Sequence, residues 1–217
     1  MSAHDVDRPG AERWVPDGGG VRALRRAAPA CRGCELWAGA TQVVFSTGSA
    51  SARLMLVGEQ PGDREDREGA PFVGPAGRLL DDALDAAGID RGEVYLTNAV
   101  KHFRFEERGK RRMHKNPAVA HIEACAPWLR AELAAVKPDV VVCLGATAGR
   151  AVLGRPVRVG QDRGHLLDGE AHRLGRARVL LTAHPSAVVR LHDRPEFDEA
   201  FDLLVADLSV AATLLAR

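Results

Sequence analysis

The sequence predicts an α/β protein, a three-layer α/β/α sandwich with a central four-stranded parallel sheet. Two observations support this prediction: short apolar runs have the length of strands buried on both faces, and a stretch with helical periodicity follows each run. The apolar runs cover residues 53–57, 94–100, 139–144 and 178–183, and the helical stretches cover 76–87, 118–136, 146–153 and 195–215. Strands and helices that alternate in this way form right-handed βαβ units, whose helices cover both faces of the sheet.

The length and composition predict one globular domain. With 217 residues, 46% hydrophobic and 27% charged, the chain can bury a sizeable core. Residues 1–20 combine Pro, Gly and charges without apolar periodicity, so we expect a flexible N-terminal leader before a single domain over 21–217. No apolar run reaches the roughly 18 to 20 residues that span a bilayer, and the N-terminus lacks a secretory signal, so we expect a cytoplasmic protein. The net charge of +1 excludes a global basic field, and no heptads or apolar stripe mark an oligomer, so we expect a monomer.

The predicted strand ends carry candidate functional residues, because ligands of such sheets bind at the carboxyl ends of the strands. The segments that leave the four strands are 58–63 (GEQPGD), 98–102 (NAVKH), 145–147 (GAT) and 184–186 (HPS). Glu59 would point into such a cleft as a base or a charge stabiliser, and the amide of Asn98 matches the N3–H and O4 edge of a uracil-like ring. Phe72 lies in a loop rich in Gly and Pro, where it could stack on a flat ring. Each has an ordinary structural alternative: an acidic turn, a strand-end cap and a core aromatic.

A basic segment follows the second predicted strand. Residues 101–115 read KHFRFEERGKRRMHK, in which Phe103 and Phe105 alternate with Lys, Arg and His. Basic residues neutralise phosphates and aromatic rings stack on bases, a combination typical of proteins that bind single strands. A solvated basic loop is the alternative. His114 lies in this segment and His184 at a strand exit, and imidazole can act there as base, acid, nucleophile or electrostatic donor.

The four cysteines are candidates for a metal site. Cys31 and Cys34 form a C-x2-C pair, and Cys143 follows Cys125 by 18 positions. Four thiolates suit zinc or an iron–sulfur cluster, and the spacing does not distinguish the two. The alternative is that Cys125 and Cys143 are small buried hydrophobic residues.

Several of these motifs, in this order, resemble the iron–sulfur uracil-DNA glycosylases of family 4 over about residues 22–213. They are GEQPG (58–62), PFVGPAG (71–77), TNAVKHF (97–103), HPS (184–186) and the four-cysteine set. The insertion RGKRRMH (108–114) further resembles the loop of the UdgX branch, whose members capture uracil-containing DNA covalently. Relatives commonly read KRRIH, and Met113 is a volume-conserving replacement for the Ile.

The resemblance implies roles for individual residues. Cys31, Cys34, Cys125 and Cys143 would hold a structural 4Fe–4S cluster, with zinc as the less favoured alternative. Catalysis would involve His114, Glu59 and His184, in which His114 attacks C1′ of the deoxyribose, Glu59 orients or deprotonates it, and His184 stabilises the charge on uracil O2. Gln60, Asp63, Phe72 and Asn98 would bind uracil. Lys101, Lys110, Arg111, Arg112, Ser186 and Arg190 would bind DNA or position the loop.

The function implied is a uracil-DNA glycosylase that excises uracil, with single-stranded DNA favoured, and becomes linked through His114 to the resulting abasic sugar in one event per molecule. The protein would be associated with the nucleoid when it is bound to DNA. Two alternatives stay open. One is a turnover glycosylase of the family 4 type with water activated by Glu59, and the other is a non-catalytic, metal-containing module that binds single-stranded DNA.

Overall fold

The computed structural model describes residues 8–109, 111–168 and 174–216 and confirms the predicted α/β architecture. Four parallel strands form the centre of the sheet: β3 (Val94–Asn98), β2 (Leu54–Gly58), β6 (Val140–Leu144) and β8 (Arg178–Thr182). Two antiparallel strands of two residues each, β1 (Ser46–Thr47) beside β3 and β7 (Leu166–Leu167) beside β8, extend the sheet to six strands. The sequence did not predict these edge strands, because two residues show no periodicity.

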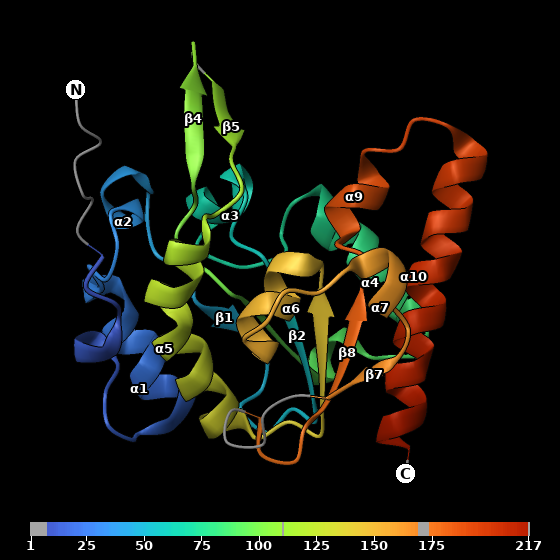
Figure 1. The fold of residues 1–217 in the computed structure, drawn as a ribbon, viewed down its shortest axis with the longest axis horizontal. Helices are drawn as coiled ribbons and strands as arrows, with labels where there is room; N and C mark the ends of the chain where they lie inside the picture. The colour runs from blue at the N-terminus through green and yellow to red at the C-terminus, as the bar shows by residue number, and fades with distance from the viewer. Residues whose placement is uncertain (1–7, 110, 169–173, 217) are drawn as a thin grey trace.

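Helices cover both faces of the sheet (Figure 1). The helices α4 (Pro75–Ala86) and α10 (Arg194–Leu215) pack on one face, and α1 (Gly20–Ala27), α5 (Val119–Val136) and α6 (Ala146–Leu153) belong to the other. Shorter helices complete the fold: η1 (Glu12–Trp14), η2 (Ala28–Ala30), α2 (Leu36–Gly39), α3 (Asp63–Glu68), η3 (Arg91–Glu93), α7 (Val159–Asp162) and α9 (Pro185–Val189).

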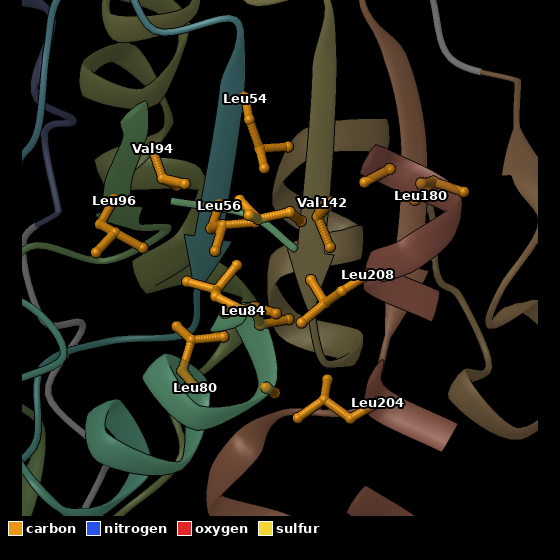
Figure 2. Close-up of a cluster of buried hydrophobic side chains, with 14 of the residues drawn as sticks. Leu54, Leu56, Leu80, Leu84, Val94, Leu96, Val142, Leu180, Leu204 and Leu208 are labelled. Atoms are coloured by element: carbon orange, nitrogen blue, oxygen red, sulfur yellow. The ribbon is translucent and has the colours of Figure 1, made fainter. Parts of the chain in front are cut away.

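The side-chain alternation of each strand divides the core in two. Leu54 and Leu56 of β2 face α4 and α10, where they meet Leu84 and Leu208 (Figure 2). The intervening Met55 faces the opposite cluster, against α5 and α6. Because both faces are apolar, the strands appear in the sequence as continuous hydrophobic runs.

A β-hairpin rises beside the carboxyl end of the sheet (Figure 1). It consists of β4 (Phe105–Arg108) and β5 (Arg111–His114), with Phe105 opposite His114 and Arg108 opposite Arg111. The sequence predicts a loop here, because the charges of this basic segment mask the strand pattern. The hairpin places His114 at its base, nearest the sheet.

The expectation of a flexible leader over 1–20 does not hold for Gly10 and Ala11. Ala11 is 1% exposed, and its backbone N–H donates to the carbonyl of Ala124 in α5 (2.8 Å). The N–H of Gly10 donates to Gly33 (3.1 Å), where a Cβ would lie only 2.9 Å from the Gly10 backbone. This stretch therefore packs on the region of Cys31 and Cys34. Residues 1–7 lie outside the described residues.

Among the described residues, the helices include none with the length and apolar character needed to cross a membrane.

Candidate active site

A cleft of about 480 Å³ opens at the carboxyl ends of the four parallel strands. The exits of β2, β3, β6 and β8 and the base of the hairpin all contribute to it, as predicted from the topology. Its lining includes Glu59, Gln60, Phe72, Asn98, His114 and His184. A larger cleft of about 620 Å³ lies at the opposite end of the sheet, around Arg53 and Asp90, but no histidine lines it. The chemistry-bearing side chains therefore converge in the smaller cleft.

Nε2 of His114 lies in the cleft beside Glu59 and Gln60. It is 3.5 Å from Oε1 of Glu59 and 2.9 Å from Nε2 of Gln60. The Gln60 amide has one possible orientation, because its oxygen accepts the backbone N–H of Arg104 (3.1 Å). Its nitrogen has two hydrogens for three nearby acceptors, which are the carbonyls of Lys115 (3.0 Å) and Arg104 (3.2 Å) and Nε2 of His114. Nε2 of His114 therefore faces both an amide group and the carboxylate of Glu59 at the cleft.

Burial lowers the pKa of His114 below its ordinary value. The negative charge of Glu59 opposes this effect, and the positive charge of Arg190 adds to it. A depressed pKa keeps the imidazole neutral near pH 7, which is the form that a nucleophile requires.

Arg112 holds the hairpin over the cleft. Its guanidinium donates to Asp63 (2.6 Å) and to the fully buried Asp66 (2.6 Å), and lies 5.0 Å from the ring centroid of Phe105. The loop-positioning role considered for Arg112 agrees with these contacts. The uracil-binding role expected for Asp63 does not, because both of its oxygens face Arg112 and Arg67. Asp63 therefore anchors the hairpin. The sequence could not reveal this role, because the partner of Asp63, Arg112, is 49 residues away.

Asn98 and Phe72 form a narrow slot at the bottom of the cleft. Gly58 makes their approach possible, because a Cβ there would lie 2.4 Å from Oδ1 of Asn98 and 2.6 Å from the Phe72 ring. Phe72 has a positive φ of 57°, unusual for an aromatic residue. The close packing of Gly77 against its carbonyl, where a Cβ would be 1.8 Å away, accompanies this conformation. The PFVGPAG motif thereby presents the ring of Phe72 to the cleft.

A backbone hydrogen bond determines the tautomer of His184. It caps α9, and the backbone N–H of Ser186 donates to its Nδ1 (3.1 Å), so the ring proton is on Nε2. Burial lowers the pKa of His184 to about 4, with added contributions from His114 and Arg190. The Phe72 and His184 rings are nearly parallel, 6.3 Å between centroids. A neutral N–H donor therefore lies beside the aromatic slot.

Comparison with known proteins agrees with this geometry. Residues 45–209 match the profile of the Uracil DNA glycosylase superfamily. The chain belongs to the uracil-DNA glycosylase superfamily. Among its relatives, the Type-4 uracil-DNA glycosylase of Thermotoga maritima is 38% identical over 161 residues, 74% of this chain and 78% of the relative. The Type-4 uracil-DNA glycosylase of Archaeoglobus fulgidus is 32% identical over 177 residues, 79% of this chain and 83% of the relative.

The residues expected to contact DNA divide into three groups in this superfamily member. Ser186 and Arg190 line the cleft, where the Ser186 hydroxyl lies 2.9 Å from Nδ1 of His184. Arg111 is exposed on the hairpin, and Lys110 lies outside the described residues. Lys101 contradicts the expectation: its side chain is 1% exposed and paired with the buried Glu132, so it cannot reach a phosphate. It belongs to a basic run in the sequence but points into the core.

Sequence reasoning missed a role for Thr147, at the start of α6. Its hydroxyl donates to Oε2 of Glu59 (2.6 Å), which leaves Oε1 facing His114. Its position at the exit of β6 is the sequence signal for this role. The sequence predicts that residues 145–147 line the cleft, but it does not predict a partner for Thr147.

Replacing Thr147 by valine should slow uracil excision without disturbing the fold. Valine keeps the shape and removes the hydrogen bond to a charged group, so we expect a rate loss of about tenfold under saturating protein. Thr147→Ser keeps the hydroxyl and should retain most of the rate. Equal rates for the two variants would show that the bond to Glu59 does not position the carboxylate.

Three of the four cysteines of this glycosylase-superfamily chain lie together. Cys31, Cys34 and Cys125 belong to one buried cluster, in which the indole N–H of Trp128 donates to Sγ of Cys31 (3.3 Å). Burial raises the pKa of Cys125 to about 12, and the negative charges of Cys34 and Cys31 add to the shift. The backbone N–H of Lys101 opposes it through a hydrogen bond to the thiol. These sulfur atoms are therefore close enough to interact electrostatically.

Cys143 contradicts the predicted four-cysteine set. It is fully buried on β6 in the other core cluster, with Met55 and Val141. The pKa of Cys143 is raised by burial alone, without a contribution from another cysteine. Cys143 lies on the face of β6 that packs in this core cluster, apart from the cluster of Cys31, Cys34 and Cys125. We therefore describe it as a core residue.

His102 is a buried histidine close in the sequence to the end of β3. It is 6% exposed and directly follows Lys101, whose backbone bonds Cys125. Burial lowers its pKa to about 4, and the charge of Arg32, next to Cys31, lowers it further. The imidazole is therefore neutral and can act as a metal ligand. Within the described ranges, no three His, Cys, Asp or Glu side chains are spaced for a single metal ion.

Proposed function

We propose that this protein is a uracil-DNA glycosylase that excises uracil and stays linked to the abasic sugar through His114. The relatives named Type-4 uracil-DNA glycosylase support the excision. The observation that carries the covalent step is the position of Nε2 of His114 at the cleft, 2.9 Å from the amide of Gln60 and 3.5 Å from the carboxylate of Glu59.

Uracil reaches the cleft as an unstacked base, because a paired base inside a duplex is inaccessible. Phe72 stacks on its ring, and Asn98 pairs with its N3–H and O4 edge. Single-stranded DNA is the favoured substrate, since no base pair has to be opened. Arg111 and Arg190 contact flanking phosphates, which carry no sequence information, so we propose selectivity for uracil with little preference for neighbouring bases.

The bond between N1 of uracil and C1′ breaks with its electron pair on the uracil. Negative charge develops on O2, where Nε2–H of His184 donates a hydrogen bond. In the tautomer with its proton on Nδ1, His114 donates the electron pair of Nε2 to C1′, and the ring is cationic until the Nδ1 proton leaves to solvent. Glu59 stabilises the positive charge on the sugar and on the ring. The product is an N-alkylated imidazole, a poor leaving group, so each molecule reacts once.

A turnover glycosylase is the second candidate, because the names of the relatives describe glycosylases without a covalent product. In that mechanism Glu59 activates a water molecule. A non-catalytic module is disfavoured by the convergence of Glu59, Asn98 and His184 in one cleft.

A denaturing gel tests the proposal. Purified protein is mixed with a uracil-containing single strand and, separately, with the same strand carrying thymine. We expect the uracil-containing strand, but not the thymine-containing strand, to give a band shifted by the mass of one protein molecule. Abasic DNA in excess of protein and without a shifted band would establish turnover, and an unreacted strand would leave the binding module.

The donor set at the N-terminal side fits the 4Fe–4S cluster implied by the family 4 resemblance. Cys31, Cys34 and Cys125, which share one buried cluster, would supply soft thiolates. We propose the buried His102 as the fourth ligand in place of Cys143. When bound, the cluster ties the N-terminal segment to α5 and to the exit of β3.

The protein acts as a monomer in the cytoplasm and is associated with the nucleoid when it is bound to DNA. Within the described residues, no helix could span a membrane.

The rate of adduct formation should depend on pH through His114. Because the pKa of His114 is lowered, its imidazole stays neutral to a lower pH than that of an ordinary histidine, and the rate should hold correspondingly further into acid. Below the pKa protonation removes the nucleophile, and the rate should fall about tenfold per pH unit. Single-turnover rates between pH 5 and 8 measure this. A midpoint of the decline at or above the ordinary pKa of histidine would contradict a depressed pKa.

A further inference from the structure

A buried ion pair lies directly behind the residue that reads uracil. Nζ of Lys101 is 2.5 Å from Oε2 of Glu132 in α5, and the two side chains are 1% and 0% exposed. Burial of two charges is costly, and apolar residues of similar volume often serve stability equally well. The pair therefore calls for a role other than holding the fold together.

The ammonium group of Lys101 uses its hydrogens on three acceptors. Besides Glu132, it donates to the hydroxyl of Thr97 (2.6 Å) and to the carbonyl of Asn98 (2.9 Å). Thr97 and Asn98 are the last residues of β3. The backbone that carries the uracil-reading amide is thus fixed by a charged donor from below, and by β2 from the side.

Glu132 is held as firmly as its partner. Its Oε1 accepts the hydroxyl protons of Tyr95 (2.9 Å) and Thr97 (2.8 Å), while Oε2 accepts Lys101. Every member of this network has a partner, and satisfied buried networks select a single geometry.

The main chain of Lys101 extends the network to the cysteine cluster. Its N–H bonds the thiol of Cys125, and its carbonyl accepts the N–H of Val44 (2.9 Å). One residue therefore contacts both the backbone of Asn98 and a proposed ligand of the cluster.

We propose that Lys101, held by Glu132, is a positioning residue that sets Asn98 in the geometry for uracil recognition. The inference rests on the proposed function, in which Asn98 reads uracil. Lys101 touches neither the base nor the DNA, and its effect is on the strand end alone.

The double variant K101M/E132Q tests this role. It removes both charges together, so neither is left buried and unpaired, and glutamine still accepts the hydroxyls of Tyr95 and Thr97. We expect the melting temperature and the iron per protein to stay near wild type. The DNA concentration that gives half-maximal reaction should rise about tenfold for the uracil strand, because the amide is misplaced. Affinity for the thymine strand should not change.

The control is R53M/D139N, which removes an ion pair at the amino-terminal end of the sheet. It should leave the uracil preference unchanged. If K101M/E132Q folds, retains its iron and keeps the wild-type uracil preference, the proposal is wrong. If it does not fold, E132D keeps both charges but retracts the carboxylate, and an unchanged uracil preference in E132D would overturn the proposal equally.

The wild-type protein separates this inference from the proposed function. Without a uracil-dependent product from the wild type, the proposed function fails. With that product, only the comparison of variants decides the role of Lys101.

Discussion

His114→Ser should abolish the heat- and detergent-stable adduct, a loss of at least about a hundredfold in shifted DNA. Serine removes the imidazole nitrogen that would bond to C1′. The side chain of His114 is 46% exposed at the base of the hairpin, so its loss should cost little stability. The measurement is the denaturing gel with a uracil-containing strand.

The space vacated by the imidazole changes the chemistry that remains. Glu59, Phe72, Asn98 and His184 are all retained, so a water molecule beside Glu59 can attack C1′. We therefore expect His114→Ser to release uracil and leave free abasic DNA, with several products per protein. The matched control is His165→Ser, because His165 is exposed and its ring contacts the backbone of Arg163. An adduct that survives in His114→Ser would show that another residue is the nucleophile.

The parts of the fold that the sequence predicts are those with a local pattern. The four parallel strands are buried on both faces, so their apolar runs are continuous, and the helices between them show apolar periodicity. The hairpin β4–β5 escaped prediction because its burial is asymmetric: Phe105 is half-buried, while Glu106 and Glu107 are exposed. A strand that contacts the protein only at its base has no repeating pattern.

The site was predictable where chain topology alone determines it. Glu59, Asn98 and His184 lie at the carboxyl ends of three parallel strands of one sheet, and these ends share one edge of the sheet. Lys101 and Asp63 were misassigned because their roles depend on partners far away in the sequence, Glu132 and Arg112. A charge near a cleft contacts DNA or another side chain according to tertiary packing, which the sequence does not display.

The metal ligands also depend on tertiary packing, although the alternation of side chains along β6 is a local signal for Cys143. Side chains alternate between the two faces of a strand, so Cys143 shares a face with Val141 and not with Val142. Counting cysteines assigned Cys143 to the metal site, whereas strand periodicity places it on a fully buried apolar face. His102 was overlooked because a histidine inside a basic segment resembles a phosphate contact.

His102→Ala should lose the iron, and Cys143→Ala should keep it. His102 lies next to the residue that bonds Cys125, while Cys143 contacts the core between β6 and the helices α5 and α6. We expect the visible absorbance and the iron per protein to fall in His102→Ala to the level of the control Cys125→Ala. Cys143→Ala should retain wild-type values, with a small decrease in melting temperature from the cavity that it leaves.

His102→Cys distinguishes a ligand from a packing residue. Thiolate is the commonest ligand of iron–sulfur clusters, so this variant should keep the iron that His102→Ala loses. The imidazole of His102 packs in a buried site, and a purely structural histidine would not be rescued by a smaller thiol. Loss of iron in Cys143→Ala, with iron retained in His102→Ala, would reverse the assignment and return Cys143 to the ligand set. Because iron is measured without DNA, this result stands independently of whether His114 forms an adduct.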